Sequence, residues 1–150
     1  MPIDDSRSPL SRARFFLNAA VTTPPDKRTE FEAFLEAAIV FGRTAVHRFQ
    51  SEYRTHSEWN TWFASMRNDA TMNFFRVERD WILKEGPPRL GQKIGMPFIG
   101  PGNRESPPAP ITSAAELYYF DDPAIPATTV VKDHLDRLEQ LLQEARALFA

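Results

Sequence analysis

The sequence predicts an all-α protein, a four-helix and mostly antiparallel bundle with a proline-rich arm before its last helix. Apolar residues recur every three or four positions over several long stretches, which is the spacing of a helix with one buried face. Most of the 13 prolines and five of the 6 glycines gather between residues 86 and 127. With 150 residues, 12 Phe and 3 Trp, the chain can bury a sizeable core, so we expect one domain spanning residues 1–150.

The first helix is expected to begin at Ser8 and Pro9, because serine caps a helix and proline suits its first turn. Apolar residues then recur at helical spacing up to Ala20. The TTPPD segment (22–26) should end this helix and start the next, with Thr23 as the cap.

The second helix is expected to reach about Tyr53. Gly42 lies in its middle, where glycine costs about 1 kcal/mol relative to alanine. This cost indicates that another helix crosses closely at Gly42.

A third long helix is expected from about Ser57 to Glu85. Phe75 and Ile82 lie off its main apolar line and form a second patch. A helix that is apolar on two sides is either central in a bundle or shared with a second subunit. We expect both, and therefore a homodimer. The main apolar line consists of Trp59, Phe63, Met66, Ala70, Phe74, Val77 and Trp81.

The proline-rich arm is expected over about residues 87–127. Within it, KIGMPFIG (93–100) and AELYYFDD (115–122) are expected to form short strands or an ordered arm that lies on the bundle. The last helix should begin at Thr128 or Thr129 and run to the end of the chain.

Several function classes lack their sequence signals. The chain has no cysteine, and its three histidines lack metal-ligand spacing, so we expect no metal site. Glycines near positions 95–102 are interrupted by prolines and precede no helix, so they do not predict a phosphate loop or a bound cofactor. No apolar run is long enough to cross a membrane, and the polar start of the chain is unlike a secretory signal. We therefore expect a cytoplasmic protein. The net charge of −2 gives no support for a strongly basic surface.

Three segments carry a family resemblance: FFLNAA (15–20), EFEAFLEAAIVFGRTAV (30–46), and W-x-x-W-F followed by MRNDATMNFFRVERDWILKEG (59–86). This order is similar to the helical bundles of HEPN-type proteins, in particular uncharacterised bacterial HEPN-like proteins. The resemblance implies a homodimeric bundle that acts on or binds RNA, a nucleotide or a partner protein, in a defence or toxin–antitoxin setting.

HEPN ribonucleases resemble one another in an arginine, a polar residue directly after it, and a histidine four to six positions beyond the arginine. Arg79 and Asp80 match the first two places, but Lys84 stands where the histidine is expected. An exposed lysine is normally protonated and is a poor base, although it can hold a phosphate as a point charge. The candidate catalytic residues are therefore Arg79, Asp80 and Lys84, in a degenerate form of the motif.

Arg43 and His47 lie four residues apart, and hence on one face of the second helix. The alternatives are an ordinary polar pair, or a set in which Arg43 joins Arg79 from the neighbouring helix. A buried Arg43 would need a carboxylate partner. The expected ligand-binding residues are Arg43, His47, Arg79 and Lys84, and the carboxylates available to Arg43 are those of Asp69, Glu78 and Asp80.

These observations leave three hypotheses for function. The first is a non-catalytic HEPN-like homodimer that binds RNA, a nucleotide or a protein partner. The second is a metal-independent endoribonuclease in which Lys84, or a histidine from elsewhere, replaces the missing one. The third is a purely structural interaction module whose arm docks on a partner, with the charged residues near Arg79 forming an ordinary solvated helix end.

Overall fold

The computed structural model describes residues 8–93, 98–99, 105–106 and 111–149, and this part of the chain is mostly helical. The all-α class predicted from the sequence is confirmed. The α-helices are α1 (Pro9–Val21), α2 (Arg28–Tyr53), α3 (Trp59–Met66), α4 (Ala70–Lys84) and α5 (Ala127–Phe149), joined by a 3₁₀ turn η1 (Ala114–Glu116) and by two-residue strands β1 (Gly91–Gln92), β2 (Phe98–Ile99), β3 (Glu105–Ser106) and β4 (Tyr118–Tyr119).

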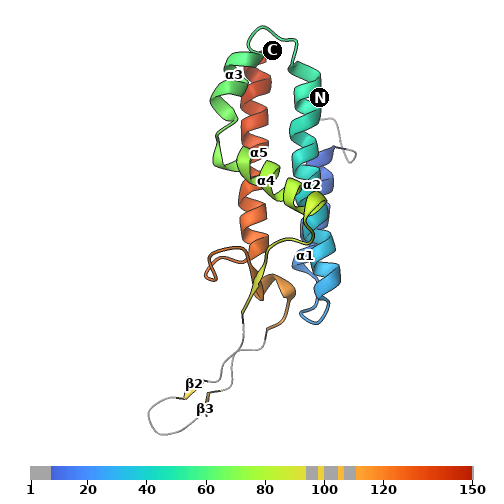
Figure 1. Ribbon diagram of the computed structural model, residues 1–150, viewed down its shortest axis with the longest axis vertical. Helices are drawn as coiled ribbons and strands as arrows, with labels where there is room; N and C mark the ends of the chain where they lie inside the picture. The colour runs from blue at the N-terminus through green and yellow to red at the C-terminus, as the bar shows by residue number, and fades with distance from the viewer. Residues whose placement is uncertain (1–7, 94–97, 100–104, 107–110, 150) are drawn as a thin grey trace.

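Three helices, α1, α2 and α5, run along the long axis of the molecule (Figure 1). α1 is antiparallel to α2 and to α5, whereas α2 and α5 run in the same direction (Figure 1). α4 lies obliquely across α2 and α5, and α3 lies beside the C-terminal end of α5 (Figure 1). Within the described residues, no helix has the length and apolar character that crossing a membrane requires.

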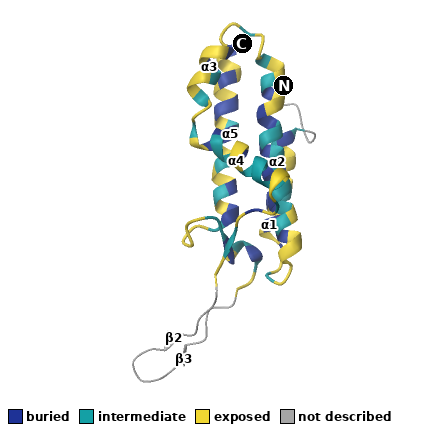
Figure 2. Ribbon diagram, viewed as in Figure 1, coloured by how far each residue is buried: buried dark blue, intermediate teal, exposed yellow. Residues whose placement is uncertain are grey.

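The core lies where the inner faces of these helices meet, as the dark stripes in Figure 2 show. α5 contributes the most regular stripe, because its apolar residues return every three or four positions. Fully buried side chains come from four helices and from the segment before α5. The largest of them are Tyr118, Phe31, Phe75, Leu35, Ile39, Leu135, Leu138, Leu141 and Val131.

The start of α1 is as predicted. Ser8 is its N-cap and accepts a hydrogen bond on its Oγ from the Ser11 amide at 3.0 Å, and Pro9 follows directly. The predicted capping role of Thr23 is wrong. α2 begins only at Arg28, and the Thr23 hydroxyl instead donates to the Ala19 carbonyl at 2.7 Å. Thr23 therefore satisfies a free carbonyl at the end of α1 rather than a free amide at the start of α2.

The close helix crossing predicted at Gly42 is confirmed. α4 crosses α2 there, and the ring of Phe75 lies directly over the glycine. A Cβ atom at position 42 would lie only 2.4 Å from Phe75 Cε1. Phe75 is fully buried, so the absence of a side chain at Gly42 is what lets the two helices approach.

The single long helix predicted from Ser57 to Glu85 is wrong, because the chain breaks between α3 and α4 at residues 67–69. Asp69 causes the break: its carboxylate accepts a hydrogen bond from the Thr71 amide at 2.9 Å and starts a new helix. Asparagine and aspartate favour such caps over helix interiors, and Asn68–Asp69 places both at this point.

The break also rotates the buried face. On α4, Phe75 is fully buried, whereas Val77, from the predicted apolar line, is 45% exposed. Phe74 and Trp81 of that line are half-buried. On α4, Phe75 of the predicted second patch therefore faces the core, whereas Ile82 is half-buried like Phe74 and Trp81 of the predicted main line.

The end of α4 and the start of the arm are tied together. α4 ends before Gly86, as predicted, and Gly86 adopts a φ of 141°, which side chains disfavour. The Trp81 indole N–H donates to the Pro87 carbonyl at 3.0 Å. The Arg89 guanidinium lies 4.3 Å from the centre of the Trp81 ring, within the range of cation–π attraction.

Short strands form in both predicted segments of the arm. β1 pairs antiparallel with β4, and β2 with β3, so the arm returns on itself (Figure 1). Its base lies on the bundle: Tyr118 is buried and stacks on Phe31 with ring centres 5.0 Å apart, and the Ala114 amide donates to the Thr23 carbonyl at 2.9 Å. The rest of the arm, residues 94–97, 100–104 and 107–110, lies outside the described residues. α5 follows at Ala127, close to the predicted start.

Candidate functional site

The crossing of α2 over α4 brings charged residues of both helices together. Arg43 and His47 lie one turn apart on α2, while Arg76, Arg79 and Asp80 lie along one flank of α4. Arg79, Asp80 and Arg76 all act electrostatically on Arg43, and Arg79 and Asp80 also act on His47. We call these five residues the α2–α4 arginine cluster. Four of them were predicted from the sequence as site residues.

Arg43 supplies a half-buried guanidinium group to the cluster. Its side chain is half-buried, and this burial, followed by the charges of Arg79 and Arg76, lowers the pKa of its guanidinium, while Asp80 acts in the opposite direction. Among the described residues, Arg43 forms no side-chain hydrogen bond or ion pair, although both neighbouring arginines do. The guanidinium of Arg43 is therefore free to bind an anion.

Asp80 neutralises only part of the positive charge. Its carboxylate lies 3.4 Å from Nη1 of Arg79, a long contact between two adjacent residues with side chains 34% and 44% exposed. Arg76 donates to the Asn73 side-chain oxygen at 3.0 Å, which adds no negative charge. The cluster therefore holds three guanidinium groups and one carboxylate.

The surroundings of His47 favour its neutral form. Partial burial is the largest cause of its lowered pKa, and the charges of Arg43 and Arg79 lower it further, against an opposing effect of Asp80. Since the ordinary value is about 6.5, the imidazole is uncharged at pH 7. A neutral imidazole beside two guanidinium groups can accept a proton.

Lys84, the residue expected in place of the motif histidine, does not join the cluster. It is exposed in the last turn of α4, five residues beyond Arg79. Lys84 is about 140° from Arg79 around the helix, although it follows Asp80 by one turn. Lys84 also has no resolved influence on Arg43 or His47.

Of the three carboxylates available as a partner for Arg43, only Asp80 has a resolved effect on it. Asp69 caps α4 and is 3.8 Å from Arg137 of α5. Glu78 is on the opposite flank of α4, where it lies 3.5 Å from Arg89, and burial raises its pKa. The sequence interpretation missed Arg76, although its position three residues before Arg79 was the signal that the two share a flank.

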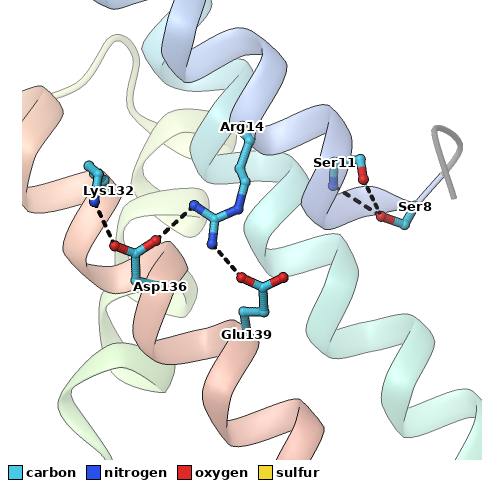
Figure 3. Close-up of polar contacts among 6 residues, drawn as sticks. All are labelled: Ser8, Ser11, Arg14, Lys132, Asp136 and Glu139. Atoms are coloured by element: carbon cyan, nitrogen blue, oxygen red, sulfur yellow. Dashed lines mark hydrogen bonds and ion pairs between the residues drawn. The ribbon is translucent and has the colours of Figure 1, made fainter. Parts of the chain in front are cut away.

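A second polar arrangement, between α1 and α5, is already neutralised (Figure 3). Arg14 donates from Nη1 to Asp136 at 2.8 Å and from Nη2 to Glu139 at 2.7 Å, and Lys132 also lies 2.7 Å from Asp136. The clamp borders a groove of about 850 Å³. Since the carboxylates here match the cations, we assign this clamp to stability rather than to ligand binding.

Other kinds of site find no support. Within the described residues, no group of three or more histidine and acidic side chains could hold a metal ion. The glycines considered as a phosphate loop, near positions 95–102, lie largely outside the described part of the chain. Comparison of the chain with known protein families, curated proteins and solved structures gave no match. Function therefore has to be inferred from the side chains of the α2–α4 arginine cluster.

Proposed function

We propose that the protein is a non-catalytic HEPN-like binding protein that holds phosphate groups of RNA or of a nucleotide at the α2–α4 arginine cluster. The observation that carries this proposal is the set of three guanidinium groups around a single carboxylate, with Arg43 half-buried and unpaired among the described residues. Holding like charges together costs free energy, and a bound anion removes that cost. Guanidinium groups suit phosphate because they donate two parallel hydrogen bonds.

The charge of the cluster differs from that of the whole chain. The chain carries a net charge of −2, whereas Arg43, Arg76 and Arg79 against Asp80 leave a local excess of positive charge. A local field of this kind attracts anions even when the total charge is negative. The negative net charge therefore does not argue against binding at this face.

The HEPN resemblance contributes two further parts of the proposal. It identifies Arg79–Asp80 as the remnant of a ribonuclease motif, and it suggests a cytoplasmic homodimer in a defence or toxin–antitoxin setting. Val77 and Leu83 of α4 are apolar side chains that are 45% and 60% exposed, on sides of the helix about 120° apart, so the proposed dimer rests on the resemblance. Sedimentation velocity of the purified protein tests the dimer.

Binding is tested by fluorescence anisotropy with a labelled single-stranded RNA oligonucleotide at low salt. Arg43→Ala and Arg79→Ala should each weaken binding about tenfold or more, since a hydrogen bond to a charged group contributes about 1.5–3 kcal/mol. Arg146→Ala, on α5 and outside the cluster, is the matched control and should leave affinity unchanged. Wild-type protein that does not bind, or equal losses in Arg146→Ala and Arg79→Ala, would contradict the proposal.

A second candidate function is a metal-independent endoribonuclease, and the position of His47 favours it. Its neutral imidazole lies beside Arg79 and Asp80, where it can accept the proton of a 2′-hydroxyl group. In this candidate His47, rather than Lys84, replaces the missing motif histidine.

Cleavage of RNA in the presence of EDTA tests the second candidate. A ribonuclease of this kind should lose activity in His47→Ala and keep it in Lys84→Ala. If folded wild-type protein binds RNA without cutting it, the non-catalytic function stands and the ribonuclease is excluded.

A further inference from the structure

His47 lies where a bound anion would act on it directly. On α2 it follows Arg43 by one turn. On α4, Arg79 follows Phe75, which contacts Gly42, by one turn, and the charges of Arg79 and Asp80 act on His47. Arg43, Arg79 and Asp80 are the charged groups whose effect on His47 is resolved. Two guanidinium groups against one carboxylate leave the imidazole in a positive field.

We propose that His47 takes up a proton when a phosphate group binds between Arg43 and Arg79, so that anion binding at this site is coupled to protonation. This inference rests on the proposed function, because it requires the phosphate to occupy the α2–α4 arginine cluster.

The physical reason is the change of field on binding. In the free protein, an imidazolium at position 47 would be repelled by the guanidinium groups of Arg43 and Arg79, and partial burial would also oppose it. A phosphate between Arg43 and Arg79 cancels much of that repulsion and offers an acceptor for a charge-assisted hydrogen bond. The imidazolium then becomes the favoured form and contributes to holding the anion.

Linkage makes the coupling reciprocal. If a bound phosphate raises the affinity of His47 for a proton, protonation raises the affinity for phosphate by the same factor. RNA should therefore bind more tightly as the pH falls from about 8 to 6, and one proton limits the gain to at most about tenfold per pH unit. The other two histidines lie elsewhere: His56 in the turn before α3, and His134 on α5 against Phe74.

The test is isothermal titration calorimetry at pH 7 with a single-stranded RNA oligonucleotide that has hydroxyl groups at both ends. Its internal phosphodiesters keep a constant charge in this range, so any proton must go to the protein. Titration in two buffers of different ionisation enthalpy gives the number of protons taken up. We expect a fraction of one proton for the wild type and for His56→Asn, and none for His47→Asn, which should bind more weakly than the wild type because only the arginines then hold the phosphate.

The outcomes separate the two proposals. If the RNA does not bind, the proposed function fails and this inference fails with it. If the RNA binds without proton uptake, or if His47→Asn takes up as many protons as the wild type, only the coupling is overturned. His47 lies at the surface with its side chain only partly covered, so circular dichroism should show that His47→Asn folds normally.

Discussion

The contact between Gly42 and Phe75 makes a quantitative prediction about stability. In Gly42→Ala the new Cβ would lie 2.4 Å from Cε1, 2.7 Å from Cδ1 and 3.0 Å from Cζ of Phe75. Ordinary carbon contacts are about 3.5–4.0 Å, so the closest pair overlaps by roughly 1 Å. Phe75 cannot withdraw easily, because it is fully buried and packs edge-on against Phe74, with ring centres 5.3 Å apart.

Two opposing terms set the magnitude. Alanine is better than glycine inside a helix by about 1 kcal/mol, whereas overpacking a buried contact costs about 1–3 kcal/mol. Gly42→Ala should therefore lower the free energy of unfolding by about 1 kcal/mol, or the Tm by roughly 2–4 °C. Gly42→Leu should cost more, since its larger side chain forces α2 and α4 apart.

Urea unfolding followed by circular dichroism measures this loss. Phe75→Leu provides the control: with a smaller side chain over position 42, Gly42→Ala should lose its cost and show the helical gain of alanine. A double-mutant cycle between the two positions should therefore give a coupling energy clearly different from zero. If Gly42→Ala stabilises the wild-type background by about 1 kcal/mol, the close contact does not exist and the reasoning is wrong.

Three other predictions concern single side chains. Burial lowers the pKa of His134, so its contribution to stability is complete above its unfolded pKa of about 6.5 and is lost as the pH falls toward its folded pKa. In urea unfolding between about pH 7.5 and 5, the free energy of unfolding should therefore decline less for His134→Gln than for the wild type. Arg14→Met should reduce the free energy of unfolding by less than about 1 kcal/mol, because the clamp is partly exposed. The difference from wild type should shrink in 1 M salt, and a difference that stays the same would argue against a charge effect. Asp69→Ala should cost about 0.5–2 kcal/mol through loss of the α4 cap, whereas Asp69→Asn, which can still cap, should cost less in the same thermal unfolding experiment.

Local signals in the sequence were enough to predict much of this fold. Ser8 and Pro9 mark the start of α1, and Gly86 marks the end of α4, because each residue has a backbone or capping preference that acts over a few positions. Gly42 predicted a crossing from its cost alone, although nothing in the sequence identified Phe75 as the residue that crosses.

The predictions from the sequence were wrong where a local capping preference changed the phase of a longer apolar pattern, or where side chains far apart in the sequence pair. The apolar line through Phe74 and Val77 continues the spacing of α3, but the cap at Asp69 restarts the helix in a different phase and turns Phe75 inward. Asn68–Asp69 is the signal in the sequence for this break, because both residue types favour helix starts over helix interiors. The bonds from Arg14 to Asp136 and Glu139 join residues more than 120 positions apart, and spacing rules say nothing about such pairs.

The candidate site was predictable in its residue types but not in its arrangement. Helical spacing placed Arg43 with His47, and the motif placed Arg79 with Asp80. The contact between Gly42 and Phe75 determines that α2 and α4 meet and at which residues they cross. This contact brings Arg43 near Arg79, whereas Lys84, one turn beyond Asp80, has no resolved effect on Arg43 or His47.

The pairing of β1 with β4 has a consequence for the evolution of chain length. Gly91 lies opposite Tyr119, and Gln92 opposite Tyr118, so the chain leaves the bundle and returns to it at neighbouring points. Paired antiparallel strands hold their Cα atoms about 4.5–5.5 Å apart, and the entropy of closing a loop between such points grows only with the logarithm of its length. Residues can therefore be added or removed beyond β1 at a small cost in stability. A segment with a different binding preference can be grafted at this position while α1 to α5 keep their packing.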